Sequence, residues 1–150
     1  YISRFSYVYL DGGLIPEQVF QLQETSSGLC LERGPSVHAK HDVVMAPCGL
    51  GEKAELQLWH RANRDRNTWS KSCCGGMANW NFLQCLGADK VGADVRTSEC
   101  GNQGYNDKQR IALSSEGALE WKNGKGCVVP HANGKDGKGP PAKVEDCTTW

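Results

Sequence analysis

The main signal for the fold is the stretch Leu29-Cys30-Leu31, which is followed by Cys48 and then by Gln57-Leu58-Trp59. The second cysteine stands 18 residues after the first, and Gln57 stands nine residues after the second. The pattern returns twice, once with Ile in place of the Trp and once without its Gln-x-Trp end. The matching residues of the second copy are Cys85, Cys100 and Gln109-Arg110-Ile111, and those of the third copy are Cys127 and Cys147. Copies that begin 42 to 55 residues apart indicate a fold built from three repeated units.

The sequence between these landmarks has the character of an all-β protein. Stretches such as Phe5–Leu10 and Phe20–Gln23 alternate at or near the two-residue period of a strand. Clusters such as Thr25–Gly28 and Lys122–Gly126 mark turns between strands. No segment shows an amphipathic helix pattern longer than about two turns. Many short strands predict a small barrel or sandwich, and three copies of one unit favour a closed barrel with three-fold pseudo-symmetry.

The composition limits what the chain can be. Its 150 residues fit one domain, and 17 basic residues balance 17 acidic ones, which argues against a basic field over the whole chain for binding nucleic acid. No apolar run approaches the roughly 18 residues of a membrane helix. Eight cysteines indicate disulfides, so we expect a secreted, extracellular or secretory-pathway lumenal protein. The start at Tyr1 lacks Met and a signal-peptide pattern, as in a processed or excised chain.

The sequence resembles the ricin-type β-trefoil lectin domain over about residues 18–150, in its repeated Cys-Leu stretches, its second cysteines and its Gln-x-Trp motif. The resemblance implies a disulfide-stapled β-trefoil of three pseudo-repeats. The expected boundaries are 18–66, 67–115 and 116–150 for the units and 1–17 for an N-terminal extension or extra strand. Two stretches, Val19–Gln23 and Asn81–Gly87, look more narrowly like the cysteine-rich domain of mannose-receptor-type endocytic receptors. The lectin domain attached to GalNAc-transferases is a comparable relative.

The repeat also predicts disulfides and core residues. The expected disulfide pairs are Cys30–Cys48, Cys85–Cys100 and Cys127–Cys147. In the first two units, Gln57 and Gln109 should satisfy backbone groups left free at a turn. The residues two positions later, Trp59 and Ile111, should point into the shared core, where burial of a Trp stabilises strongly.

Two features fall outside this pattern. Cys73 and Cys74 have no place in the repeat, and they form either a vicinal disulfide or bonds to other partners. A zinc site is less favoured, because four-ligand spacing is absent. The third unit is incomplete, since its Gln-x-Trp would fall near position 156 and the sequence stops at Trp150. Either Trp150 supplies the apolar core residue that the third unit lacks, or the strand Phe5–Leu10 lies along the unpaired edge that the missing strand would leave.

The resemblance implies one shallow sugar pocket in each unit. In that family, the sugar-binding residues are an Asp directly after Cys-Leu, an aromatic residue in the next loop and an Asn before the Gln of Gln-x-Trp. The Asp and the Asn hydrogen-bond the sugar hydroxyls, and the aromatic ring packs against the apolar face of the sugar. No unit keeps the whole set. The first keeps most, with Glu32 as acceptor and His38 or His41 as ring, although a solvated turn also explains Glu32. The second has Gly87 and Lys108 at the Asp and Asn positions.

A Lys-rich segment of the third unit is a candidate site for an anionic sugar. Its five lysines, in residues 122–143, face one acid, Asp136, and Lys and Asn donors beside aromatic rings suit a sulfate group. The candidate ligand residues are Trp121, Lys122, Asn123, Lys125, His131, Asn133, Lys135, Lys138 and Trp150. A loop kept soluble by Lys and Gly explains the same composition.

The sequence contains no catalytic motif such as Gly-x-Ser-x-Gly, His-Glu-x-x-His or a phosphate-binding glycine loop. We therefore expect no enzyme but a lectin-like module that binds carbohydrate, with anionic or sulfated glycans as one ligand class. The alternative is a β-trefoil that has lost sugar binding and serves protein interaction, cell adhesion or receptor binding. The expected partners are glycans, glycoproteins and other domains of a larger protein, without nucleic acid, membrane insertion, metal or cofactor.

Overall fold

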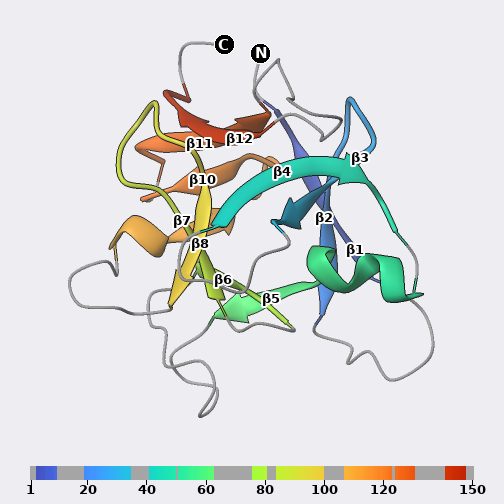
Figure 1. The fold of residues 1–150 in the computed structure, drawn as a ribbon. Helices are drawn as coiled ribbons and strands as arrows, with labels where there is room; N and C mark the ends of the chain where they lie inside the picture. Colours follow the sequence, from blue (N-terminus) through green and yellow to red (C-terminus); the bar gives the residue numbers. More distant parts are fainter. Residues whose placement is uncertain are drawn as a thin grey trace.

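The structure, a computed structural model, describes residues 3–9, 19–34, 41–49, 51–62, 76–80, 84–99, 107–122, 124–130 and 141–147. Within these ranges the chain is all-β, with twelve strands and two short 3-10 helices (Figure 1). The strands are β1 (Phe5–Tyr9), β2 (Phe20–Glu24), β3 (Leu29–Arg33), β4 (His41–Pro47), β5 (Trp59–Ala62), β6 (Gly76–Asn79), β7 (Gln84–Gly87), β8 (Arg96–Glu99), β9 (Ile111–Leu113), β10 (Leu119–Trp121), β11 (Gly126–Pro130) and β12 (Ala142–Glu145). The 3-10 helices are η1 (Gly51–Gln57) and η2 (Asp107–Gln109). None of these elements is a helix long and apolar enough to cross a membrane.

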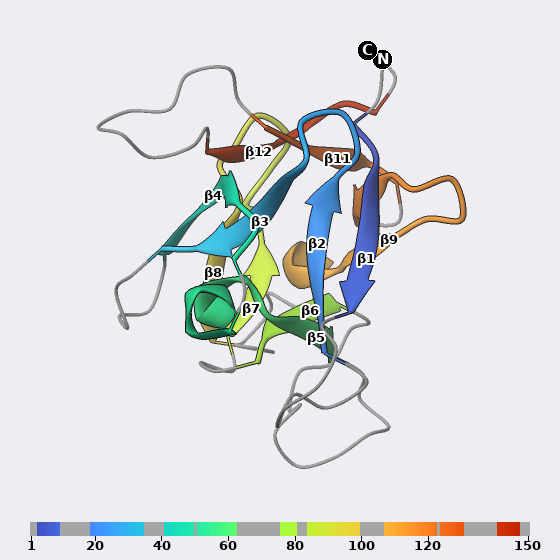
Figure 2. The same ribbon diagram turned by 90° about the vertical axis from the view of Figure 1, so that its right-hand side faces the viewer.

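The strands form two sheets that bridge one another. Eight strands run in the order β1-β2-β3-β4-β8-β7-β6-β5, and an additional pairing of β5 with β2 nearly closes this sheet on itself. The second sheet has the order β12-β11-β10-β9. Isolated bridges join the two sheets at Arg4–Ala118, Val44–Pro141 and Asp94–Lys143. The result is a barrel-like body, with β1 alongside β2 in Figure 2.

The strand register repeats three times along the chain. In each unit the first cysteine pairs with the residue two positions before the second cysteine of that unit. The three pairs are Cys30–Ala46, Cys85–Ser98 and Cys127–Glu145. Because the three hairpins share one register, the cysteine spacing of the sequence corresponds to a repeat in the structure.

The core repeats with the same period. Equivalent positions of the three units each contribute one side chain, and every side chain in these sets is at most 3% exposed. The sets are Leu22, Met77 and Leu119; Leu31, Leu86 and Val128; Val43, Val95 and Ala142; and Trp59, Ile111 and Phe5. Burial of each large apolar side chain stabilises the fold by about 1.5–3 kcal/mol, so the units support one another through this shared core.

Two predicted disulfides are present, Cys30–Cys48 and Cys127–Cys147. The first closes the hairpin of β3 and β4, and the second closes the hairpin of β11 and β12. Cys85 is also disulfide-bonded. Its predicted partner Cys100 lies outside the described residues, as do Cys73 and Cys74.

Strand β1 takes the place at which the last strand of the third unit is expected. The last strand of the first unit, β5, pairs with β6, and the last strand of the second unit, β9, pairs with β10. In the same way β1 pairs with β2, the first strand of the first unit. Phe5 thereby takes the place that Trp59 and Ile111 take in the other units, and it is 3% exposed. Of the two alternatives, the structure therefore has the N-terminal strand along this edge, whereas Trp150 lies outside the described residues.

A buried cation joins the first unit to the second. Arg33 is 0% exposed, and its Nε donates to Oε1 of Gln84 at 2.9 Å. Its Nη1 donates to the carbonyl oxygen of Gly34, also at 2.9 Å. Burial lowers the pKa of Arg33 from the ordinary arginine value, yet the guanidinium stays protonated at neutral pH.

Candidate functional site

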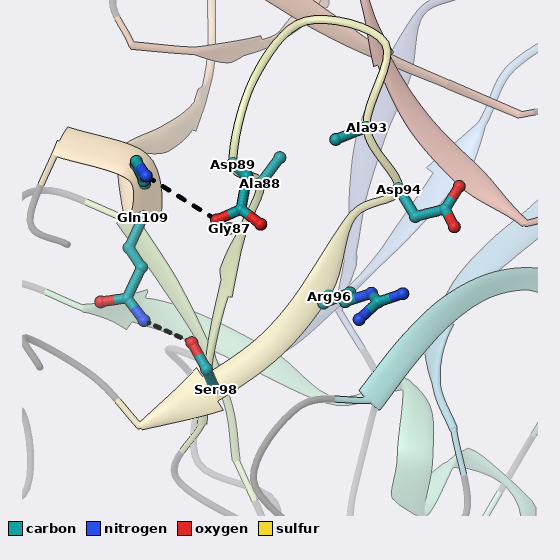
Figure 3. Close-up of a pocket in the computed structure, with 9 residues that line it drawn as sticks. Gly87, Ala88, Asp89, Ala93, Asp94, Arg96, Ser98 and Gln109 are labelled. Atoms are coloured by element: carbon teal, nitrogen blue, oxygen red, sulfur yellow. Dashed lines mark hydrogen bonds and ion pairs between the residues drawn. The ribbon is translucent and has the colours of Figure 1, made fainter.

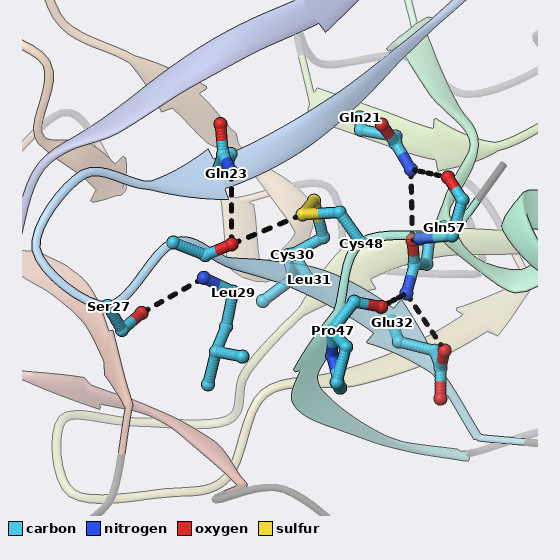
Figure 4. Close-up of a disulfide and its surroundings, with 12 residues drawn as sticks. Gln21, Gln23, Ser27, Leu29, Cys30, Leu31, Glu32, Pro47, Cys48 and Gln57 are labelled. Atoms are coloured by element: carbon cyan, nitrogen blue, oxygen red, sulfur yellow. Dashed lines mark hydrogen bonds between the residues drawn. A yellow bond between two sulfur atoms is a disulfide. The ribbon is translucent and has the colours of Figure 1, made fainter.

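In the first unit, Gln57 holds the turn that follows β4. Its Nε2 donates to the carbonyl oxygen of Pro47 at 2.8 Å, and its Oε1 accepts the backbone N–H of Gly49 at 2.8 Å (Figure 4). Two residues later Trp59 is fully buried, and its indole N–H donates to the carbonyl oxygen of Leu31 at 3.1 Å. These contacts are the roles expected for a Gln-x-Trp motif.

Glu32 belongs to the same hydrogen-bond network. It lies in β3 rather than in a turn and is half-buried, and its Oε1 accepts a hydrogen bond from Nε2 of Gln57 at 3.1 Å. Gln57 Oε1 also accepts from Nε2 of Gln21 at 2.9 Å. The network fixes one carboxylate beside the motif, as an acceptor for a sugar hydroxyl requires. Of the two candidate rings, His38 lies outside the described residues, and of His41 only the backbone, in β4, is described.

The second unit has a pocket at the place equivalent to Glu32. The residue after Cys85-Leu86 is Gly87, and a Cβ there would lie 2.9 Å from the carbonyl oxygen of Lys108 and 3.0 Å from Cγ of Gln109. Helix η2 therefore packs directly on β7, where the backbone N–H of Ala88 donates to the Lys108 carbonyl oxygen at 3.0 Å. A cavity of about 180 Å³ opens beside this contact.

Polar side chains from β8, η2 and the loop between β7 and β8 line this pocket (Figure 3). At its base, Oγ of Ser98 accepts from Nε2 of Gln109 at 2.9 Å. On one wall, Nζ of Lys108 lies 3.8 Å from Oδ1 of Asp89, and the other wall carries Asp94. Carboxylates accept hydrogen bonds from hydroxyl groups, while ammonium and hydroxyl groups donate them. The pocket can therefore hydrogen-bond a polyhydroxylated molecule from both sides.

The third unit holds both walls of the pocket. Nζ of Lys143 in β12 lies 4.0 Å from Oδ1 of Asp94, and the backbones of these two residues form a bridge. The opposite wall is fixed by the indole N–H of Trp121, which donates to the carbonyl oxygen of Lys108 at 3.0 Å. Both walls are therefore fixed by contacts with a neighbouring unit.

Trp121, one of the candidate ligand residues of the Lys-rich segment, is a buried residue. It is 4% exposed and belongs to the core, two positions after the buried Leu119 in β10. A Trp on the inward face of a strand contributes to the core, so the ring of Trp121 leaves little surface for a ligand to contact. Lys122 lies over the Trp121 ring, with Nζ 5.3 Å from the centroid, and Lys125 is exposed. The remaining candidates of that segment lie outside the described residues: Asn123, His131, Asn133, Lys135, Lys138 and Trp150.

Sequence reasoning missed the acids and the hydroxyl of the second-unit pocket. The family pattern has an acid directly after Cys-Leu, but that position is Gly87, and the carboxylates come from Asp89 and Asp94 in the following loop. A usable signal is present, because a glycine at the acid position is followed two residues later by an Asp. Ser98 carries no such signal, since only its register opposite Cys85 shows where it lies.

The described residues contain no group of three His, Cys, Asp or Glu side chains that could hold a metal ion. Among solved structures, the chain is similar to one in the crystal structure of the Haemophilus ducreyi cytolethal distending toxin. The TM-score is 0.60 at 10% sequence identity, over 93% of this chain and 81% of that chain. At this identity the likeness concerns the fold alone. No family model and no curated protein sequence matches the chain.

Proposed function

We propose that the chain is a ricin-type β-trefoil that serves as a non-catalytic carbohydrate-recognition module. The trefoil is supported by three hairpins of one register, by four core sets of three equivalent residues and by the hydrogen bonds of Gln57. The sugar-binding role is supported above all by one observation. A polar pocket of about 180 Å³ lies beside Gln109, where the lectin pattern predicts the sugar of the second unit.

The lining of the pocket suits one sugar unit. Asp89 and Asp94 accept hydrogen bonds from sugar hydroxyls, and Lys108 donates to ring or hydroxyl oxygens. Ser98 already accepts from Gln109, so its own hydroxyl proton is directed to another acceptor. The methyl group of Ala93 offers an apolar contact for the C–H groups of the ring. Glu32 of the first unit provides a second acceptor on the same kind of motif, and two weak sites raise the avidity for a branched glycan.

The proposed partners and location follow from this role. Glycans and glycoproteins are the proposed ligands, with other domains of a larger protein as further partners. Disulfide bonds are stable in oxidising compartments, which supports a secreted, extracellular or secretory-pathway lumenal protein.

A second candidate function is a protein-interaction or adhesion module that has lost sugar binding. One observation favours it: among the described residues that line the second-unit pocket, none is aromatic. These lining residues therefore do not supply the stacking surface that lectins commonly use.

A glycan array with neutral, sialylated and sulfated members tests the proposal. A glycan that binds is then titrated by calorimetry against Asp89→Asn and Ser98→Ala. We expect Asp89→Asn to weaken binding about tenfold, because a charge-assisted hydrogen bond contributes about 1.5–3 kcal/mol. Glu116→Gln, at an exposed carboxylate in the turn between β9 and β10, is the matched control and should bind as the unchanged protein does. If no glycan on the array binds, the protein-interaction function is favoured. Equal affinity of all variants for the glycan would exclude this pocket as the sugar-binding site.

A further inference from the structure

The hydrogen bonds of the buried Arg33 reach from the first unit into the second. Arg33 ends β3 directly after Glu32, and its Nε donates to Oε1 of Gln84 at 2.9 Å. Gln84 begins β7, the strand that carries Gly87 to the second-unit pocket. The same Oε1 accepts a hydrogen bond from Oγ1 of Thr97 in β8 at 3.4 Å. One amide oxygen of Gln84 therefore holds one side chain from each of the two units.

Thr97 stands directly before a residue of the pocket. Ser98 is next in β8, and its Oγ accepts the hydrogen bond from Nε2 of Gln109 at the base of the pocket, at 2.9 Å (Figure 3). Successive side chains of a strand point to opposite faces, so Thr97 is buried at 0% exposure while Ser98 lines the pocket. A shift of Thr97 would therefore move Ser98 with it.

Backbone contacts join the two units at the same place. Arg33 pairs with Val43 in the hairpin of β3 and β4, and the backbone N–H of Val43 donates to the carbonyl oxygen of Val95 at 3.2 Å. In β4, His41 pairs with Thr97 of β8. The hydrogen bonds of the Arg33 side chain thus add to a backbone junction between the first-unit hairpin and β8.

The cation at this position occurs in one unit only. Arg33 stands three residues after the first cysteine of its unit, where the second unit has Ala88 and the third has Pro130. Burial of a cation costs desolvation energy, and an apolar side chain of similar size often stabilises a core as well. Hydrogen bonds of buried polar groups can instead select one arrangement of the elements that they join, because another arrangement leaves these groups unsatisfied. The network of Arg33 suits such a role at the boundary between two units.

We infer that Arg33 is a positioning residue for the second-unit pocket: through Gln84 it fixes Thr97, and with it the hydroxyl group of Ser98. Neither Arg33 nor Gln84 is among the described residues that line the pocket, so both act from behind it. Binding sites need such support, since small displacements of their polar groups weaken binding. The inference rests on the proposed function for the use of the pocket, whereas the position of Ser98 can be observed without a ligand.

Amide NMR spectra of the ligand-free ¹⁵N-labelled protein test the positioning itself. The readout is the side-chain amide signal of Gln109, whose Nε2 donates to Ser98. Arg33→Met removes the donor to Gln84 and keeps a long side chain, so we expect it to shift this signal and to speed its exchange with water. The melting temperature should change little, because an apolar side chain replaces a buried cation. An unchanged Gln109 side-chain signal would overturn the inference.

Two substitutions of Gln84 test the shared oxygen and give an independent answer if Arg33→Met does not fold. Gln84→Glu keeps an oxygen that accepts from Arg33 and Thr97, so the Gln109 signal should stay near its position. Gln84→Leu removes this oxygen and should shift the signal as Arg33→Met does. Equal shifts for both Gln84 variants would contradict the role of the oxygen.

The matched control is Gln21→Leu, which disturbs a buried network within the first unit. Gln21 is 2% exposed, and its Nε2 donates to the carbonyl oxygen of Gly49 and to Oε1 of Gln57. The variant should leave the side-chain signal of Gln109 in place. A shift as large as that of Arg33→Met would indicate a general loosening of the fold and would overturn the inference.

Calorimetry with a glycan selected on the array extends the test to binding. Arg33→Met and Gln84→Leu should lower the affinity about threefold to tenfold, as the loss of one well-placed hydrogen bond does. Gln84→Glu and Gln21→Leu should bind as the unchanged protein does. Unchanged affinity of Arg33→Met would overturn the inference and leave the proposed function intact. If no glycan binds while the Gln109 signal moves as expected, the proposed function fails and the positioning role of Arg33 remains.

Discussion

The backbone N–H of Thr25 donates a hydrogen bond to the carbonyl oxygen of Arg4 at 2.8 Å, and this contact ties the N-terminal strand to the first unit. The same hydrogen bond joins Trp80 to Leu58 and Lys122 to Arg110, at 2.8 and 2.9 Å. Strand β1 is thus attached as the last strands of the other two units are. It takes the place expected for the last strand of the third unit.

This closure predicts that Phe5 is as important to stability as the apolar residues of the Gln-x-Trp stretches. Phe5→Ala should lower the free energy of unfolding by about 3–5 kcal/mol, because it leaves a cavity in the shared core. Urea unfolding measures this change. Ser6→Ala, at an exposed position of the same strand, should change the stability little. A loss for Phe5→Ala no larger than that for Ser6→Ala would show that β1 is not part of the core.

Gln57 should be more important than a surface glutamine. Gln57→Ala leaves Nε2 of Gln21, the N–H of Gly49 and the carbonyl oxygen of Pro47 without this partner in a partly buried turn. Since each unsatisfied buried group costs about 1–3 kcal/mol, we expect a loss of at least about 2 kcal/mol in thermal or chemical unfolding. Gln23→Ala, which removes one exposed hydrogen bond to Gly28, is the control and should cost less than half as much. Similar losses for both variants would contradict the role of Gln57.

Much of this fold could be predicted from the sequence, because the signals are local. Cysteine spacing and strand alternation are visible in single hairpins, and Cys30–Cys48 and Cys127–Cys147 follow from them. Such local signals do not predict the position of β1. It depends on the pairing of Phe5 with Glu24 and on a contact between Phe5 and Gly117, far along the chain.

The candidate site was harder to predict, for a physical reason. The exposure of a single aromatic residue depends on which face of its strand is inward, and the lysines around Trp121 in the sequence do not show that its ring is buried. The second-unit pocket forms because η2 packs against Gly87 and because β12 holds Asp94. Both contacts join segments that are distant in sequence, so no local sequence motif predicts them.

The shared register predicts the partner of Cys85. Cys85 pairs with Ser98 as Cys30 pairs with Ala46, so we expect Cys85 to be bonded to Cys100 as Cys30 is bonded to Cys48. Peptide mapping without reduction should recover Cys85 linked to Cys100. Replacing both with Ser should lower the stability by about 2–4 kcal/mol. A link from Cys85 to Cys73 or Cys74 would contradict the three-fold arrangement.

Gly76 should not tolerate a side chain. A Cβ on Gly76 would overlap the carbonyl group of Gln109, so Gly76→Ala must displace the end of η2. We expect a loss of about 1–3 kcal/mol from overpacking, together with weaker sugar binding, because η2 forms one wall of the pocket. Gly28→Asn is the control: Gly28 has a φ of 75° and open space around an added Cβ, and Asn accepts this conformation. Equal stability of Gly76→Ala and the unchanged protein would contradict the packing of η2.

The most direct test of the lectin assignment is a titration of the ¹⁵N-labelled protein with a glycan selected on the array, followed by amide NMR spectra. We expect saturable shifts at residues of the second-unit pocket: Ala88, Asp89, Ser98 and Gln109. Asp89→Asn should require an about tenfold higher glycan concentration to reach the same shifts, while Glu116→Gln should leave the titration unchanged. Shifts that avoid these four amides, or an absence of shifts with every glycan class, would contradict carbohydrate recognition at this pocket.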